Sequence, residues 1–455
     1  MILKLIVPKR KTADTELENW GGQFQSIVFG VKKYSAMIAS IPVIAALTPE
    51  DVNIIIKDEN IEDINFDEKV DLVGISANTS LATRAYEIAD EFRKRNVQVV
   101  IGGIHTSMLP EEGLLHADTI VKGEAENIWK QVIEDFKNNN LKKIYESPEK
   151  PDINLSPIPR YDLLNNKKYN FHILQTTRGC PYNCEFCSVQ TYFGKKYRCK
   201  SVEKVIKEIE FVNSIDKKLI FFCDDNFLVD KKRAKELLKA MIPLKTPYTI
   251  QATIEIYEDD ELLDLLVASG CLSILIGFES INQKNLAEVH KGNQYKVDLY
   301  YKAIGKIQSK GIIILGSFIF GFDDDDINVF ERTVNFIKDS GIGNCFVNIL
   351  TPLPGTQLFF KLEKEKRILN KSWAYFDCCH VCYKPKNMSE KDLENGYCWA
   401  FQELFELNTV FNRLMKLYNN WNENNVRLNE RIFPIIANLS SHYVAYSYPK
   451  AKAPK

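Results

Sequence analysis

The chain has 455 residues, 45% of them hydrophobic and 26% charged, a composition typical of a soluble globular protein with two or three domains. Its 59 basic and 60 acidic residues nearly cancel, so no overall positive field would draw it to nucleic acid or anionic lipid. No apolar run reaches the roughly 18 residues of a transmembrane helix, and the apolar amino-terminal run is too short for a signal peptide. Eleven cysteines without such a signal indicate a reducing cytoplasm.

Strands and helices alternate from residue 1 to residue 137, which predicts a first domain with a doubly wound, flavodoxin-like parallel sheet covered on both faces. Its strands are predicted at Ile2–Val7, Val52–Ile56, Val70–Ile75, Val97–Ile101 and Thr119–Val121.

Ligands of such sheets bind at the carboxyl ends of the strands, where the strand order reverses. The candidates at those ends are Ser76, Asn78, Thr79, Gly102, Gly103, His105 and Glu124. They suit a polar ligand, although turn glycines and helix caps would give the same residues.

Residues 138–168 are polar and contain four prolines, so an ordered linker is expected there. Alternation then resumes over residues 169–356. Six strand and helix units predict a partial (β/α)6 barrel with its chemistry at the carboxyl ends of the strands. These strands are predicted at Phe171–Gln175, Leu219–Cys223, Tyr248–Thr253, Leu272–Gly277, Ile312–Phe318 and Cys345–Leu350.

Cys180, Cys184 and Cys187 follow the first barrel strand in a C-x3-C-x2-C spacing. Iron-sulfur clusters usually take four thiolates, so three would leave one iron with an open coordination position. Zinc is the competing metal, but no second pair of ligands lies nearby in the sequence to complete a tetrahedron. The spacing therefore favours a cluster that can bind and activate a small molecule.

Polar residues also end the other barrel strands: Asp225, Gln251, Glu279 and Ser317. A carboxylate or amide at these positions can accept hydrogen bonds from an ammonium group, and Glu279 could hold ribose hydroxyls. Any one of the four could instead be a cap or turn residue. Arg178 and Arg198, on either side of the cysteines, could hold a carboxylate bidentately or form ordinary salt bridges.

The cysteine spacing after a strand, with Phe186 directly before the last cysteine, resembles the signature of radical S-adenosylmethionine (SAM) enzymes. In that family the open iron of a [4Fe-4S] cluster binds the amino and carboxylate groups of SAM, and an electron from the cluster cleaves SAM to a radical. The resemblance implies that Phe186, Asp225, Gln251, Glu279 and Ser317 contact SAM.

The Gly-Gly-x-His and Gly-Glu-x-Glu turns ahead of this motif resemble the cobalamin-binding domain of cobalamin-dependent radical SAM enzymes, which implies that the candidates of the first domain contact cobalamin. Many cobalamin proteins supply a histidine to cobalt from an Asp-x-His-x-x-Gly sequence. Here the segment Asp58–Asp63 holds no histidine. That departure implies either cobalamin bound without a histidine ligand or a domain that has lost it. His105 is expected to be a pocket contact and not a cobalt ligand.

Residues 357–455 read as a mainly helical extension, since apolar residues recur at spacings of three and four. The segments Tyr375–Asp377 and Lys384–Ser389, followed by this helical tail, resemble the extension of the subfamily that includes the hopanoid C-2 methylases. Cys378, Cys379 and Cys382 are interpreted as core or substrate-pocket residues, because adjacent cysteines are awkward metal ligands.

The resemblance implies a cobalamin-dependent enzyme that methylates an unactivated carbon of a hydrophobic small molecule or lipid, with a reductant such as ferredoxin or flavodoxin. One alternative is a radical SAM enzyme with a cobalamin-free first domain that couples, cyclises or rearranges its substrate. A non-catalytic cobalamin sensor would not need the three cysteines. A methylthiotransferase would carry further cluster cysteines within residues 1–168, where this chain has none.

Overall fold

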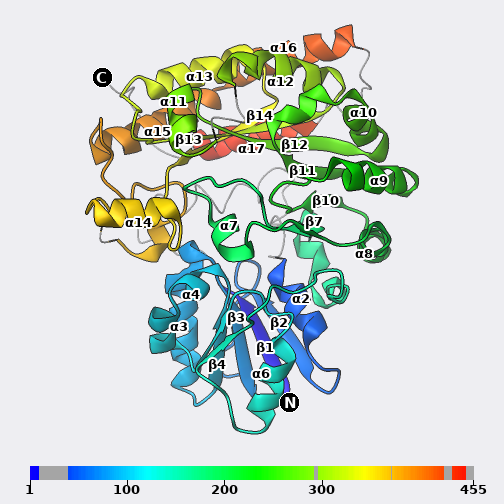
Figure 1. Cartoon of the computed structure of the whole chain (residues 1–455), viewed down its shortest axis with the longest axis vertical. Coiled ribbons are helices and arrows are strands. Elements are labelled where there is room, and N and C mark those ends of the chain that lie inside the picture. Colours follow the sequence, from blue (N-terminus) through cyan, green and yellow to red (C-terminus); the bar gives the residue numbers. More distant parts are fainter. Residues whose placement is uncertain (10–38, 292–295, 370, 425–432, 447–455) are drawn as a thin grey trace.

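The computed structural model describes residues 1–9, 39–291, 296–369, 371–424 and 433–446. Two six-stranded parallel sheets dominate it, one in each of the two α/β domains predicted from the sequence (Figure 1). A short helix, α7 (Ser188–Phe193), lies between the two domains, and a helical carboxyl-terminal part packs against the second of them.

The first sheet has the strand order β2-β1-β3-β4-β5-β6, so the order reverses beside β1, as in a doubly wound fold. Side chains alternate across β1: Leu3 and Leu5 enter one hydrophobic cluster and Ile6 the opposite one. The strands are β1 (Ile2–Val7), β2 (Asn53–Asp58), β3 (Leu72–Ser76), β4 (Gln98–Gly102), β5 (Thr119–Lys122) and β6 (Ile144–Glu146).

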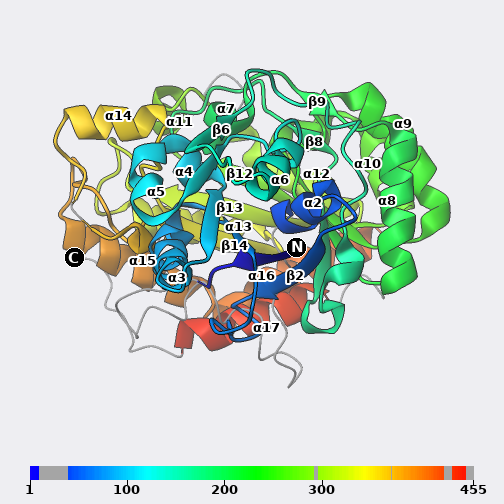
Figure 2. The ribbon, with the colours of Figure 1, turned by 90° about the horizontal axis from the view of Figure 1, so that it is seen from below.

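Helices cover both faces of this sheet, which confirms the predicted fold class. Figure 2 shows α2 (Ser40–Leu47) and α6 (Trp129–Lys137) on one side and α3 (Ala82–Arg93), α4 (Ile104–Met108) and α5 (Pro110–His116) on the other. Strand β6 lies inside the stretch expected to be a linker, and it pairs with β5. The sheet therefore continues beyond residue 137, to Glu146.

The second sheet has the order β14-β13-β12-β11-β10-β7, an open half-barrel that confirms the predicted fold. One hydrophobic core joins the sheet to the helices that connect its strands. The strands are β7 (Phe171–Leu174), β10 (Leu219–Phe222), β11 (Tyr248–Ala252), β12 (Cys271–Glu279), β13 (Ile313–Phe320) and β14 (Asn344–Ile349). The helices are α8 (Val202–Ile215), α9 (Lys231–Met241), α10 (Asp260–Ser269), α11 (Gln283–Glu288), α12 (Tyr300–Ser309) and α13 (Val329–Ser340).

The carboxyl-terminal part is helical, as predicted: α14 (Gln357–Lys364), α15 (Glu390–Leu404), α16 (Leu407–Glu423) and α17 (Phe433–Tyr446). Buried side chains of α15 and α16 join the core of the half-barrel, and the Trp421 indole N–H donates to the Gln308 carbonyl at 2.8 Å. No helix in the described ranges combines the length and apolar character needed to cross a membrane.

The segment between α14 and α15 contacts the first domain. The Trp373 indole N–H donates to Glu112 Oε1 at 2.8 Å, and the hydroxyls of Ser372 and Thr83 lie 2.9 Å apart. The ring of Trp373 also meets the edge of His105 at a centroid distance of 5.0 Å. The first domain is therefore held by the carboxyl-terminal part as well as by the half-barrel.

Candidate active site

The three motif cysteines lie on one loop, residues 179–197, that follows β7. A small antiparallel ribbon closes the base of this loop, formed by β8 (Thr177–Arg178) and β9 (Arg198–Cys199). Asp224, which follows β10, holds the chain where it enters β8. Its carboxylate accepts hydrogen bonds from the Thr176 N–H and hydroxyl, both at 2.6 Å, and from the Thr177 N–H at 3.0 Å. Asp224 is fully buried, so this anchor is a structural element of the loop.

The cysteines open into a cavity of about 290 Å³ at the carboxyl ends of the half-barrel strands. Every residue predicted from the sequence for the cluster or for SAM lines this cavity: Cys180, Cys184, Cys187, Phe186, Asp225, Gln251, Glu279 and Ser317. Sequence positions 137 residues apart thus meet in one place, because parallel strands present their carboxyl ends at a common edge.

The electrostatics of this cavity suit a cationic ligand. Asp225 Oδ2 is buried and has no hydrogen-bond partner among the described residues. Burial, together with the neighbouring Asp224, raises the pKa of Asp225 to about 7. A desolvated carboxylate of this kind gains most from a positive partner, such as the ammonium group of an amino acid.

Lys291 is a cavity residue that the sequence analysis missed. Its ammonium group lies 2.6 Å from Glu279 Oε1 and 2.8 Å from the Gly277 carbonyl oxygen. The ion pair orients the Glu279 side chain at the end of β12. No sequence signal marks Lys291, since it lies on a connection after α11 and not at the end of a strand.

The cysteines fit a cluster better than a single ion. Among the residues that the structure describes, no three His, Cys, Asp or Glu side chains converge on one ion position. A [4Fe-4S] cluster does not require convergence, since each cysteine ligates a different iron. Burial raises the pKa of Cys180 to about 11 and that of Cys187 to about 12, so these thiols must release protons when metal binds.

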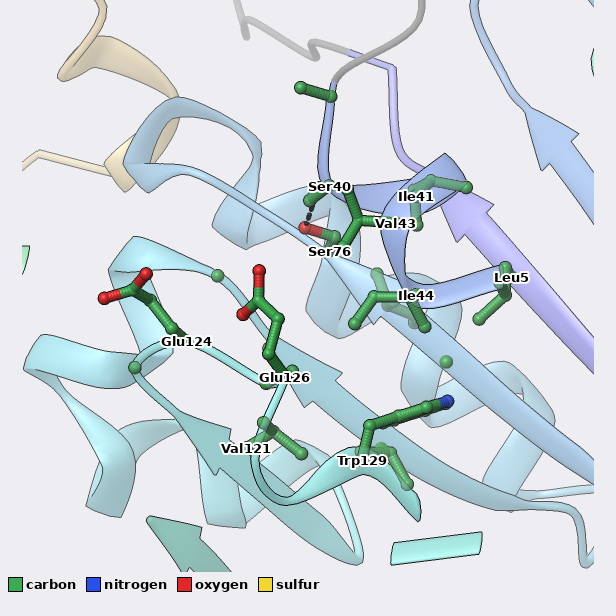
Figure 3. Close-up of a pocket in the computed structure, with 18 of the residues that line it drawn as sticks. Leu5, Ser40, Ile41, Val43, Ile44, Ser76, Val121, Glu124, Glu126 and Trp129 are labelled. Atoms are coloured by element: carbon green, nitrogen blue, oxygen red, sulfur yellow. Dashed lines mark hydrogen bonds between the residues drawn. The ribbon is translucent and has the colours of Figure 1, made fainter. Parts of the chain in front are cut away.

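A second cavity, of about 190 Å³, lies between the first domain and the half-barrel. Figure 3 shows the wall that the first domain contributes. Its walls are mostly apolar, with Leu5, Ile44, Val121 and Trp129 among them, and two carboxylates project on one side. A cavity of this volume can hold one part of a large cofactor and not the whole of it.

Four of the residues predicted to contact cobalamin line this second cavity: Ser76, Gly102, Gly103 and Glu124. Ser76 and Ser40 form a hydroxyl pair at 2.9 Å across its rim. Gly103 has φ +105°, and a Cβ there would overlap the Ala77 carbonyl, so only glycine presents bare backbone at this edge. Apolar walls beside exposed backbone fit an apolar part of a corrinoid.

The structure does not place the other three predicted cobalamin contacts at the cavity. Asn78 caps a short helical turn by accepting the Leu81 N–H at 3.2 Å, and Thr79 is buried within that turn. His105 is fully buried and points to Glu112, with its Nε2 at 3.3 Å from Glu112 Oε1. His105 therefore belongs to the contact with Trp373, which sequence reasoning could not foresee.

Tyr192 and Phe193, at the end of α7, line the second cavity and were also missed. The Tyr192 hydroxyl donates to the Gly123 carbonyl at 2.9 Å. Among the described residues, no histidine lines this cavity, in keeping with the lack of a histidine in the segment Asp58–Asp63. Helix α7 starts directly after Cys187, so one short helix connects the two cavities.

Fold and site together define a radical SAM enzyme with a corrinoid-type first domain. Comparisons with known proteins agree: residues 39–133 match the B12 binding domain, residues 174–337 the radical SAM superfamily, and residues 356–443 a domain of unknown function. The chain belongs to the family of cobalamin-dependent radical SAM methyltransferases, and its cofactors are a [4Fe-4S] cluster, SAM and cobalamin.

One relative is the bacteriochlorophyllide d C-8(2)-methyltransferase of Chlorobaculum tepidum, 34% identical over 83% of this chain and 87% of the relative. Another is the hopanoid C-2 methylase of Rhodopseudomonas palustris, 28% identical over 72% of this chain and 64% of the relative. Among solved structures, the cobalamin-dependent SAM radical enzyme OxsB shares the fold, with a TM-score of 0.67 at 14% identity over 99% of this chain and 76% of that chain.

Proposed function

We propose that this enzyme methylates an unactivated carbon of a hydrophobic ring compound. The observation that carries the proposal is the adjacency of the two cavities: Arg178 and α7, which flank the cysteines in sequence, also form walls of the corrinoid cavity. A corrinoid in one cavity and a cluster in the other could then both reach the same bound substrate. Relatives that act on bacteriochlorophyllide d and on hopanoids support an extended, largely apolar ring system as that substrate.

An aromatic segment supports the same substrate class. Trp373, Tyr375 and Phe376 lie where the carboxyl-terminal part meets the first domain, and the rings of Trp373 and Phe376 are 4.8 Å apart. Cys378 and Cys379 follow, half-buried, while Cys382 is fully buried. Phe376 and Cys382 are buried, so the half-buried Trp373, Tyr375, Cys378 and Cys379 are the side chains that would offer an apolar surface to a planar or polycyclic molecule.

The residues of the cysteine cavity have distinct proposed roles. When bound, the cluster and SAM supply one-electron cleavage that removes a hydrogen atom from the substrate, and cobalamin supplies the methyl group. The thiolates of Cys180, Cys184 and Cys187 would hold the cluster. Asp225 would accept hydrogen bonds from the ammonium group of SAM, and Glu279, oriented by Lys291, would accept hydrogen bonds from ribose hydroxyls. Phe186, Gln251 and Ser317 complete the walls and exclude water.

The test is the mass of the product. Anaerobically reconstituted enzyme would be incubated with cobalamin, a reductant, and SAM carrying a deuterated methyl group, with bacteriochlorophyllide d and a hopanoid as trial substrates. A product heavier by the labelled methyl group supports the proposal, and Cys184→Ala should give none. A product that has lost hydrogens or dimerised, formed equally well without cobalamin, would favour coupling or cyclisation instead.

We also propose a small acidic electron carrier, a ferredoxin or flavodoxin, as the reductant, and the cytoplasm as the compartment. All eleven cysteines are free thiols, as a reducing environment requires. The check on the reductant is a comparison of turnover with reduced flavodoxin and with dithionite. A reaction that proceeds with dithionite but with neither reduced flavodoxin nor reduced ferredoxin would argue for another donor.

A further inference from the structure

The ribbon at the base of the cysteine loop places two positive charges side by side. Arg178 and Arg198 are direct partners in its antiparallel register, and their side chains are only 12% and 9% exposed. Like charges opposite each other on a ribbon are destabilising, and a buried charge without a partner is more so. The ribbon can therefore close stably only if a carboxylate lies between the two guanidinium groups.

That carboxylate comes from the other domain. Glu124, in the turn after β5, has a side chain that is 2% exposed. Its Oε2 accepts from Arg178 at 2.6 Å and from Arg198 at 3.0 Å, and its Oε1 accepts from Arg198 at 2.7 Å. Glu126 lies 2.6 Å from Arg178 as a second counter-ion. One glutamate of the cobalamin domain thus holds both arginines of the cluster loop.

The ribbon in turn sets the shape of the cysteine loop. The Cys180 N–H points at the Gly194 carbonyl at 3.4 Å, so the first cysteine is fixed against the far end of the loop. A tilt of β8 against β9 would shift Cys180 relative to Cys184 and Cys187. Glu124 and Arg178 also line the corrinoid cavity, whereas Arg198 does not.

We propose that Glu124 is a positioning residue that couples the corrinoid cavity to the cluster loop. A corrinoid in the cavity fixes the turn that carries Glu124, and the fixed carboxylate holds the arginine pair and hence the cysteines. Coupling between two sites is reciprocal, so an assembled cluster must tighten corrinoid binding by the same factor. The proposal concerns cofactor binding alone and holds whichever substrate is methylated.

The experiment measures the dissociation constant of hydroxocobalamin for the full-length protein, once without and once with a reconstituted cluster. In the wild type the cluster should tighten binding by about tenfold, within the usual range of coupling between sites. In Glu124→Gln and in Arg198→Met this ratio should fall to about one. The matched control is Glu59→Gln, which breaks a similarly buried pair with Arg84 in the same domain, at 2.5 Å, and should keep the wild-type ratio.

Arg198→Met is the decisive variant because Arg198 does not line the cavity. If Glu124→Gln weakens corrinoid binding equally with and without the cluster, Glu124 is a cavity contact only and the proposal is wrong. A wild-type ratio of one, or an unchanged ratio in Arg198→Met, also overturns it. If Arg198→Met does not fold, Arg198→Lys keeps the charge and loses the two-point contact, and should lower the ratio. As a spectroscopic readout, hydroxocobalamin should change the Mössbauer spectrum of the oxidised cluster, which exchanges no electron with it, in the wild type but not in Glu124→Gln.

Discussion

At the scale of single residues, Asp224 and Asp225 are neighbours in sequence with opposite roles. Asp224 accepts three hydrogen bonds inside the protein, whereas Asp225 lines the cysteine cavity and keeps one buried oxygen without a hydrogen-bond partner among the described residues. Asp225→Asn removes the charge that a SAM ammonium group would meet. A charge-assisted hydrogen bond contributes about 1.5–3 kcal/mol, so SAM affinity should fall by about tenfold or more.

Thermal unfolding separates the two aspartates. Asp225→Asn should leave the melting temperature unchanged or higher, because it removes a desolvated charge, and its iron content should be normal. Asp224→Asn should lower the melting temperature by loss of the anchor at Thr176. Equal SAM affinity in Asp225→Asn and wild type, measured by calorimetry on the reconstituted protein, would refute the proposed role of Asp225.

The cysteines give a second prediction at this scale. Cys184→Ala removes one of three iron ligands, so reconstitution should yield close to no iron instead of about four irons per chain. Cys199→Ala is the matched control, since Cys199 lies at the base of the same loop without lining the cavity, and it should bind iron normally. Iron and sulfide analysis measures both. A full cluster in Cys184→Ala would mean that another residue supplies the ligand.

Sequence reasoning located the cysteine cavity and only part of the corrinoid cavity, for a physical reason. Residues at the carboxyl ends of parallel strands must converge, so Asp225, Gln251, Glu279 and Ser317 could be found from strand positions alone. For a residue beyond the strand end, the position in the sequence does not decide whether its side chain points into the cavity or away from it. His105 turns toward Glu112 and Trp373, and Trp373 lies 261 residues from Glu112, so no local pattern encodes the choice.

At the scale of elements, the strands of both sheets except β6 were predictable from runs of apolar residues, but the ribbon β8–β9 was not. Each of its strands has two residues, too few to show alternation. Strand β6, with three residues among polar and proline-rich sequence, was missed for the same reason. Short elements are fixed by tertiary contacts, here by Asp224 and by the arginine pair with Glu124.

Two glycines of the cysteine loop allow a test of that ribbon. Gly179 (φ +90°) and Gly194 (φ +85°) are both in backbone conformations that disfavour other residues, at a cost of about 1–3 kcal/mol. A Cβ at Gly179 would overlap the Lys196 carbonyl, whereas one at Gly194 meets open space. Gly179→Ala should therefore lower the melting temperature more than Gly194→Ala and should impair iron uptake. Equal effects of the two variants would show that packing at Gly179 is unimportant.

At the scale of the whole molecule, the carboxyl-terminal part bridges the half-barrel and the cobalamin domain. Trp373→Phe keeps a ring beside His105 but removes the hydrogen bond to Glu112. Amide hydrogen exchange in α4 and α5 should become faster, because one of their tertiary contacts is lost. Trp421→Phe is the matched control: it removes an indole hydrogen bond of the same length, 2.8 Å, within the packing of α16 on the half-barrel. If amide exchange in α4 and α5 stays as slow in Trp373→Phe as in the wild type, the hydrogen bond from Trp373 does not stabilise these helices.

The carboxyl edges of the two sheets face one another, since the ends of β3, β4 and β5 and the residues after β7 line the same cavity. A corrinoid seated there would contact both domains, so its release would break contacts on two sides. It would then behave as a resident group, installed once and kept over many turnovers, and not as a travelling cosubstrate. Prolonged dialysis of loaded enzyme against a differently labelled corrinoid would reveal this as exchange that takes hours, while SAM equilibrates quickly.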